Sequence, residues 1–258
     1  MCFDLDSRPP IVPIAGGALD SARLTLSGDD GGTFAAFRAR AAAPTGAGII
    51  VLPDVRGLHP YFEELALRFA EHGVDAVAID YFGRTAGAEP RRDDFESMPH
   101  VSQTTWAGLG ADVRAAAADL RSPGGGSVRS LFTIGFCMGG RLSFLAATLG
   151  LEFAGVVGFY GWPVGPARND TPAPADVAGS MASPVLAIFG GGDQGIPPSA
   201  IGEFETALEE ARVEHRIVTY PDAPHSFFDR KSSEFADTSE AAWAATLSFI
   251  RARTIAAD

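Results

Sequence analysis

Residues 130–140 read Ser-Leu-Phe-Thr-Ile-Gly-Phe-Cys-Met-Gly-Gly, a short apolar run that ends in a glycine-rich turn. The apolar run predicts a buried strand over 129–135, and the segment after the turn predicts a helix over 138–149. Between them the spacing is Gly-x-Cys-x-Gly-Gly, the nucleophile-elbow pattern with sulfur in place of oxygen. Glycines are needed on both sides because side chains in so sharp a turn would clash with the strand and the helix. We therefore expect Cys137 in an unusual backbone conformation between strand and helix.

A helix that begins just after Cys137 would aim the positive end of its dipole at the sulfur, which favours the thiolate. The N–H of Met138 would then be available to a developing oxyanion. The alternative is a buried structural cysteine in a glycine-rich turn. The strand-turn-helix context favours the nucleophile.

Segments rich in Val, Ile and Phe alternate with longer Ala-rich segments along the chain, a rhythm typical of a mostly parallel sheet. We predict strands over 21–27, 33–40, 47–53, 74–80, 129–135, 154–160, 184–190 and 213–220, and helices over 60–72, 106–121, 138–149, 199–211 and 236–253. Only Ser27-Gly-Asp-Asp-Gly-Gly-Thr33 joins the first two strands, which leaves room for a hairpin and not for a helix. The predicted fold class is α/β: a mostly parallel sheet of about eight strands with an antiparallel N-terminal edge and helices on both faces.

The composition bounds the class of protein. Of 258 residues, 46 % are apolar and 20 % charged, which excludes a disordered chain and permits a large core. The net charge of −12 argues against a nucleic-acid partner and against an anionic membrane surface. The two cysteines, Cys2 and Cys137, form neither a disulfide framework nor a metal-ligand spacing.

The chain contains no apolar run near the ~18 residues of a membrane span, and its start is acidic where a signal peptide is basic. We expect a cytoplasmic protein, monomeric by default. We also expect one domain over 1–258, with an N-terminal extension over 1–20, since single α/β domains of about 200–250 residues are common.

Two irregular stretches, 83–103 and 161–181, are rich in Gly, Pro or charge. Both follow predicted strands, so they should emerge at the sheet edge where α/β proteins bind ligands. Long loops in compact domains are usually functional or disordered. We predict that these stretches form the walls of the pocket.

Elbow enzymes carry nucleophile, acid and base in that order along the chain. His225 follows the strand predicted over 213–220 and should lie at the same sheet edge as the elbow, whereas His215 begins that strand at the opposite edge. His225 is therefore the predicted base. Asp193 follows the preceding strand and would orient it. Asp222, three residues before His225, is the nearest rival acid.

Other side chains at this edge are candidates for binding. The N–H of Val55 is placed as the second oxyanion donor. Asp54 could accept the thiol proton, or cap the helix predicted to begin at residue 60. Arg84 offers a planar fork for a substrate carboxylate, or lies on the surface beside acidic residues, and Arg56 and Arg141 carry the same ambiguity. Four further candidates for substrate contact are Tyr81, Trp162, Ser226 and Phe227.

With Cys137, Asp193 and His225 in this order, the chain resembles the dienelactone hydrolases (carboxymethylenebutenolidases) of the α/β-hydrolase fold. The resemblance covers nearly the whole chain and rests on Gly-Phe-Cys-Met-Gly-Gly-Arg (135–141), Asp54-Val-Arg-Gly-Leu58, Asp80-Tyr-Phe-Gly-Arg84-Thr, Phe189-Gly-Gly-Gly-Asp193 and Pro224-His225-Ser-Phe-Phe-Asp-Arg230. It implies a cysteine nucleophile that attacks a lactone or ester carbonyl, with His225 as base and Asp193 as its orienter.

The resemblance also implies a carboxylate near the thiol that activates it, and an arginine that holds a carboxylate of the substrate. Asp54 stands where the family usually has glutamate, and Arg84 stands at the arginine position. A second family arginine, four residues beyond the histidine, is replaced here by Asp229, and Arg230 follows it.

The leading hypothesis is a cysteine hydrolase that opens small lactones or cleaves small carboxylic esters through an acyl-thioester, with no cofactor and no metal. One alternative is a general small-ester carboxylesterase of the same fold. Another is a weakly catalytic ligand-binding or redox-sensing protein with an oxidisable Cys137. A Mg²⁺ site made of Asp54, Asp80 and Asp193 would indicate phosphotransfer, but it leaves the elbow unexplained, and no nucleotide or zinc motif is present.

Overall fold

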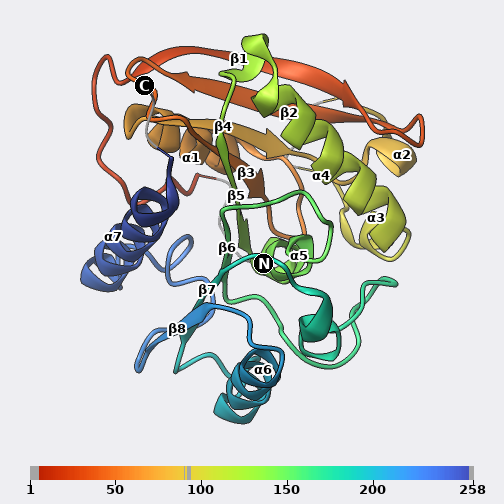
Figure 1. Cartoon of the computed structure of the whole chain (residues 1–258), viewed down its shortest axis with the longest axis vertical. Coiled ribbons are helices and arrows are strands. Elements are labelled where there is room, and N and C mark those ends of the chain that lie inside the picture. Colours follow the sequence, from red (N-terminus) through yellow and green to blue (C-terminus); the bar gives the residue numbers. More distant parts are fainter. Residues whose placement is uncertain (1–5, 90, 92–93, 256–258) are drawn as a thin grey trace.

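Eight strands form one sheet in the order β1-β2-β4-β3-β5-β6-β7-β8 (Figure 1). This computed structural model describes residues 6–89, 91 and 94–255, so Cys2 lies outside the described residues. The strands are β1 (Ala18–Ser27), β2 (Thr33–Ala41), β3 (Ala47–Leu52), β4 (Val74–Ile79), β5 (Ser130–Phe136), β6 (Gly155–Phe159), β7 (Val185–Gly190) and β8 (His215–Tyr220). The predicted sheet of about eight strands is confirmed.

The first two strands form the predicted antiparallel hairpin, with Ser27 opposite Thr33 next to the turn. β2 also runs antiparallel to β4, and all the other pairs are parallel. β1 begins at Ala18, earlier than the predicted residue 21, so the end of the segment predicted as an extension belongs to the sheet. The antiparallel N-terminal edge is confirmed.

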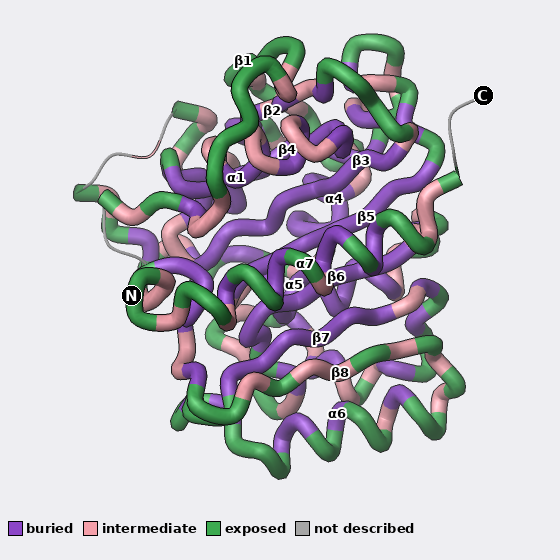
Figure 2. The backbone as a smooth tube through the Cα atoms, turned by 90° about the vertical axis from the view of Figure 1, so that its left-hand side faces the viewer, coloured by how far each residue is buried: buried purple, intermediate pink, exposed green. Residues whose placement is uncertain are grey.

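The middle of the sheet forms the core of the molecule. Every residue of β3, β4, β5, β6 and β7 is buried, as expected for parallel strands that are covered on both faces. The edge strands differ: β1 is mostly exposed and β8 is partly exposed (Figure 2). The apolar runs of the sequence therefore mark the central strands.

Five longer helices cover the two faces: α1 (Pro60–Glu71), α4 (Trp106–Arg121), α5 (Met138–Ala146), α6 (Pro198–Glu210) and α7 (Ala236–Arg253). α1 and α7 lie on one face, where the rings of Phe69 and Trp243 are 4.7 Å apart (Figure 1). α4, α5 and α6 lie on the other, where the rings of Phe144 and Phe204 are 5.0 Å apart. None of the helices in the described part of the chain has the length and apolar character of a membrane-spanning segment.

The two stretches predicted as irregular contain short helical turns. The first holds α2 (Gly83–Ala86) and α3 (Met98–Val101), and the second holds η2 (Ala175–Ser180); η1 (Pro123–Gly125) follows α4. An ion pair fixes part of the first stretch, since Arg91 donates to the buried Asp80 carboxylate at 2.7 and 3.1 Å. Turns this short lack the periodicity that reveals a helix in sequence.

The direction of strand addition reverses at β3, with β4 on one side and β5 on the other. Loops that leave the carboxyl ends of β3 and β5 therefore diverge and leave room for a ligand. α5 begins at this point and approaches the sheet closely. A Cβ atom added at Gly139 would lie 2.0 Å from the carbonyl oxygen of Leu52, and one added at Gly135 would lie 1.8 Å from that of Gly139. The glycines of the elbow allow this contact.

The close approach predicts a large effect from one methyl group. Gly139→Ala should lower the free energy of unfolding by about 3 kcal/mol, because the methyl group must push α5 away from β3. Gly202→Ala is the control, since Gly202 lies in α6 with no atom within 4 Å of its added Cβ. That change should be neutral or stabilise by up to ~1 kcal/mol. Urea unfolding measures both, and equal stabilities of the two variants would contradict the packing described.

Candidate active site

Cys137 occupies the turn between β5 and α5 with φ of 55° and ψ of −114°. A positive φ is strained for a residue with a side chain. The main-chain N–H of Cys137 donates to the carbonyl oxygen of Phe159 at 3.0 Å, and this hydrogen bond helps to hold the strained conformation. The side chain is partly exposed, and Met138 is the first residue of α5. The sulfur therefore stands at a helix N-terminus at the carboxyl end of the sheet.

The structure brings Asp193, and not Asp222, to His225. Nδ1 of His225 lies 2.6 Å from Oδ2 of Asp193, and the N–H of Gly195 donates to Oδ1 at 2.8 Å. Burial would raise the pKa of Asp193, but the hydrogen bond and the charge of His225 outweigh it, so the pKa lies below the usual value. Asp222 is exposed. His215 contacts the Val213 carbonyl at the start of β8.

A cavity of about 250 Å³ joins the thiol to the imidazole. Its lining comprises Val55, Val101, Cys137, Met138, Arg141, Leu142, Tyr160, Trp162, Pro166, Ala167, Arg168, Asn169, Thr171, Ile196 and His225. The stretch 161–181 supplies much of this wall, as predicted, whereas 83–103 supplies Val101 alone. Most of the lining is apolar, which suits a small organic substrate.

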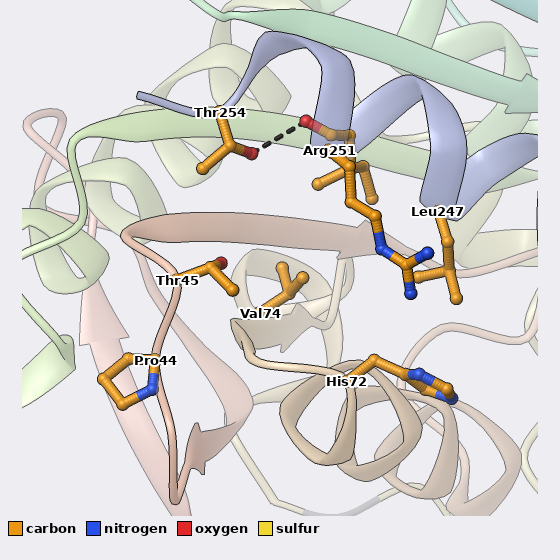
Figure 3. A pocket seen from close by; sticks show the side chains of 8 residues that line it. Pro44, Thr45, His72, Val74, Leu247, Arg251 and Thr254 are labelled. Carbon is orange, nitrogen blue, oxygen red and sulfur yellow. Dashed lines mark hydrogen bonds between the residues drawn. The ribbon is translucent and has the colours of Figure 1, made fainter. Parts of the chain in front are cut away.

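A larger cavity, of about 410 Å³, lies at the opposite end of the sheet. Figure 3 shows Arg251 above His72 on the right, with Val74 and Thr45 to their left. Val74 is the first residue of β4, so this cavity opens at the amino ends of the parallel strands. None of the described residues that line it is a cysteine. Ligands of α/β sheets bind at the carboxyl ends, so the smaller cavity is the candidate active site.

Arg141 fixes the wall of the active-site cavity. It is buried, and its guanidinium donates to the carbonyl oxygens of Trp162, Gly165, Thr171 and Pro172 at 2.8–3.2 Å. Burial lowers the pKa of this group to about 10. The sequence alone did not decide whether Arg141 binds substrate or lies on the surface. In the structure, Arg141 is buried and holds the main chain of the loop that forms the cavity wall.

Arg84 does not reach the cavity. Its guanidinium donates to both oxygens of Asp112 at 2.7 and 2.8 Å and to both oxygens of Asp30 at 2.8 and 3.0 Å. Asp112 is fully buried in α4, so the ion pair joins α2 to that helix and to the hairpin. Two carboxylates of the protein occupy the guanidinium fork, which argues against the predicted contact with a substrate carboxylate.

Three more predicted substrate contacts lie behind the cavity wall. The hydroxyl of Tyr81 donates to the carbonyl oxygen of Pro53 at 2.8 Å. Ser226 and Phe227 are fully buried, and the Phe227 ring packs on Tyr160 and Tyr220. None of the three lines the cavity, whereas Trp162 does. A residue that adjoins His225 in sequence can either line the cavity or pack behind its wall. The sequence alone does not distinguish these two positions.

The carboxylates of the Mg²⁺ hypothesis point to protein partners. Asp80 binds Arg91, Asp193 binds His225, and Oδ1 of Asp54 accepts from the N–H of Arg56 at 2.9 Å. Across the described residues, no three His, Cys, Asp or Glu side chains form a group that could hold a metal ion. Asp54 itself is fully buried in the loop after β3, next to Val55.

Sequence reasoning missed Tyr160 and Arg168. Tyr160 follows β6 with φ of 38° and contributes its ring to the cavity. Its position at a strand end was the available signal. Arg168 is an exposed residue of the cavity lining, within the stretch 161–181. That stretch was recognised as a wall, but the side chain that faces the cavity depends on the path of the loop, which no sequence pattern specifies.

Comparison with known proteins decides the family. A model of the "Dienelactone hydrolase family" matches residues 34–254. The chain belongs to the dienelactone hydrolase family. A "Putative carboxymethylenebutenolidase" from Salmonella typhimurium is 33 % identical over 230 residues, which cover 85 % of this chain and 82 % of that protein. The resemblance seen in the sequence is thereby confirmed.

Two further relatives of this dienelactone hydrolase family member are informative. The crystal structure of a "Putative Dienelactone Hydrolase" from Klebsiella pneumoniae has a TM-score of 0.77 and 26 % identity, covering 90 % of this chain and 98 % of that one. A Bradyrhizobium protein named "Probable 2-oxo-3-(5-oxofuran-2-ylidene)propanoate lactonase" is 27 % identical, covering 79 % and 82 %. The family member described here is a hydrolase of carboxylic esters or lactones with the α/β-hydrolase fold.

The ion pairs of Arg84 predict a structural effect of its replacement. Arg84→Gln should lower the free energy of unfolding by about 3 kcal/mol, because the buried Asp112 loses its partner. KM for substrates that carry a carboxylate should stay unchanged. Arg114→Gln is the control, because it breaks an exposed pair with Asp29, and ion pairs that are screened by solvent add little to stability. Thermal unfolding and steady-state kinetics test both variants, and a raised KM in Arg84→Gln would restore the binding role.

Proposed function

We propose that the protein hydrolyses small lactones or esters with Cys137 as nucleophile, His225 as base and Asp193 as orienter of the base. The observation that carries the proposal is that Cys137 and His225 line one cavity while Asp193 holds Nδ1 of the imidazole. With Nδ1 engaged, the imidazole exchanges protons through Nε2. This arrangement follows the acid-base logic of nucleophilic catalysis.

In the proposed reaction the thiol proton passes by way of Asp54 to the imidazole of His225, the thiolate attacks the carbonyl carbon, and a tetrahedral oxyanion forms. The carbon–oxygen bond of the ester or lactone then breaks, and the imidazolium gives its proton to the leaving alkoxide. Water attacks the resulting thioester, the imidazole takes its proton, and the thiolate leaves with release of the carboxylic acid. All atoms are supplied by substrate, water and the two side chains.

The N–H groups of Met138 and Val55 are the proposed oxyanion donors. Met138 is the first residue of α5, a position whose N–H has no acceptor within the helix. Val55 lines the same cavity from the loop after β3. Two main-chain donors at a helix N-terminus stabilise the charge that develops on the carbonyl oxygen.

Asp54 is the proposed acceptor of the thiol proton. Asp54 and the thiol of Cys137 both act on the hydroxyl of Tyr81. Burial raises the pKa of this hydroxyl well above the usual value, and the charges of Asp54, Asp80 and Cys137 raise it further. Asp54 and Cys137 thus lie near one tyrosine. Asp54 replaces the glutamate that is usual in the family, and its loop position beside Val55 brings the shorter carboxylate to the carboxyl end of β3.

The proposed substrates are small lactones or esters that carry a carboxylate. The Bradyrhizobium relative is named for a lactone of this kind, a propanoate joined to an oxofuran ring. In this chain, Arg168 lies in the cavity lining and can bind such a carboxylate, whereas Arg84 is held elsewhere and Arg141 binds main-chain carbonyls. If the guanidinium of Arg168 binds the carboxylate of the substrate, the lactone ring can occupy the apolar part of the cavity.

The first test compares the native protein with Cys137→Ala on a dienelactone, followed by ultraviolet absorbance. Native protein should turn over many equivalents, and the variant should lose at least ~10³-fold in kcat/KM because no thioester forms. Mass spectrometry of native protein quenched during turnover should show the acyl adduct on the peptide that contains Cys137. Turnover retained by Cys137→Ala would refute the nucleophile, and turnover of simple esters alone would indicate a general carboxylesterase.

A second test concerns Arg168. Arg168→Met should raise KM about tenfold for substrates with a carboxylate, through loss of a charged hydrogen bond, and leave KM for a neutral ester unchanged. Arg230→Met is the matched control, because Arg230 is exposed and lies outside the cavity lining. Equal KM values for the carboxylate substrate in native protein and in Arg168→Met would rule out this anchor.

A further inference from the structure

The loop that carries His225 also carries a buried carboxyl group that the proposed reaction does not use. Asp229, four residues after His225, is 4 % exposed. One of its oxygens accepts a 2.8 Å hydrogen bond from the hydroxyl of Tyr160, and the other accepts from the main-chain N–H of Arg230. A buried carboxylate is costly unless it is well compensated, and these two neutral donors compensate it only in part.

Tyr160 links this carboxyl group to the active site. Its ring is fully buried, lines the cavity, and lies 4.8 Å from the imidazole of His225 between centroids. Its backbone has a φ of 38°, a conformation that is unusual for an aromatic residue, and its N–H donates to Ile188 at 2.7 Å. The tyrosine is therefore held by Asp229 at its hydroxyl and packs on His225 with its ring.

Several charged or titratable groups face this pair. Asp54, from the loop after β3, and His225 both act on Asp229, and Tyr61 of α1 lies close enough to feel the charges of Asp229 and Asp54. Asp193 holds His225 from the loop after β7, and Cys137 shares its cavity. Arg141 and Arg168 line that cavity as well. Burial and then Asp54 raise the pKa of Asp229 to about 7, although the hydrogen bonds from Tyr160 and Arg230 and the charge of His225 lower it.

We propose that Asp229 is a positioning residue for His225 that acts through Tyr160. It fixes the tyrosine ring against the imidazole, and the loss or gain of its proton shifts the pH range over which His225 acts as a base. This inference rests on the proposed role of His225. The sign follows from charge: ionised Asp229 stabilises the imidazolium, so His225 keeps its proton to higher pH, and a neutral group at this position lets the proton leave at lower pH.

The test is a titration of His225 by NMR, which needs no substrate. Asp229→Asn keeps the size of the side chain and an acceptor for the tyrosine hydroxyl, and it removes the charge. His225→Gln assigns the signal among the five histidines. In Asp229→Asn the imidazole should titrate lower by on the order of 0.5 pH unit. Asp222→Asn, which removes an exposed charge three residues before His225, should shift it by under ~0.1 unit.

Tyr160→Phe tests the link itself and replaces Asp229→Asn if that variant fails to fold. It keeps the ring and removes the hydrogen bond to Asp229, so kcat should fall about fivefold with KM unchanged, the size of one lost hydrogen bond. The pH profile of kcat/KM should also move. The inference would be overturned if the titration of His225 and the pH profile of kcat/KM in both Asp229→Asn and Tyr160→Phe were the same as in the native protein.

The outcomes separate this inference from the proposed function. Turnover retained by His225→Gln would overturn the role of the base, and this inference with it. Loss of turnover in His225→Gln, together with an unshifted titration in Asp229→Asn, would overturn the positioning role of Asp229 alone. Loss of turnover together with the shifted titration supports both.

Discussion

The main chain of α5 passes so close to β3 and β5 that no Cβ atom fits between them. Gly135 and Gly139 make this contact possible, and the rest of the site depends on it. Because the helix starts this close to the sheet, the residue before it must turn through a positive φ, and that residue is Cys137. The same contact puts the N-terminus of α5 at the point where strand addition reverses, so the thiol, the first N–H of the helix and the crevice coincide.

The contact between Asp193 and His225 depends on the sheet in a simpler way. Asp193 and His225 are 32 residues apart in sequence, but β7 and β8 are parallel neighbours, so the loops after them emerge side by side. The 2.6 Å contact between the two side chains needs only that each follow its strand by a few residues. Parallel pairing therefore brings residues that are distant along the chain to neighbouring positions at one edge of the sheet, which is why the residues after predicted strands indicate the site.

Sequence could not predict the contacts of those side chains whose partners come from distant segments of the chain. The strands, the long helices and the antiparallel edge can be predicted from local sequence pattern. The common location of Cys137, Asp193 and His225 can be predicted because each follows a parallel strand. Arg84 is different, because its partners Asp30 and Asp112 come from a hairpin and from α4. Phe227 turns away from the cavity for a similar reason, because its ring packs against Phe159 and Tyr220, and Ser226 beside it is buried as well. Periodicity carries no information on either choice.

Arg141 has a consequence for how the specificity of this enzyme can change. Its guanidinium binds four carbonyl oxygens of the segment 162–172 and no side chain of that segment. Every amino acid presents the same carbonyl group, so these four contacts do not depend on which side chains the loop carries. Asn169 is different, because its side chain donates to Thr104 and accepts from Thr171. Residues 167 and 168 can thus be exchanged in evolution or in the laboratory while the hydrogen bonds that hold the backbone stay in place. New substrate preferences become accessible through single substitutions, with Cys137, Asp193 and His225 and their geometry left untouched.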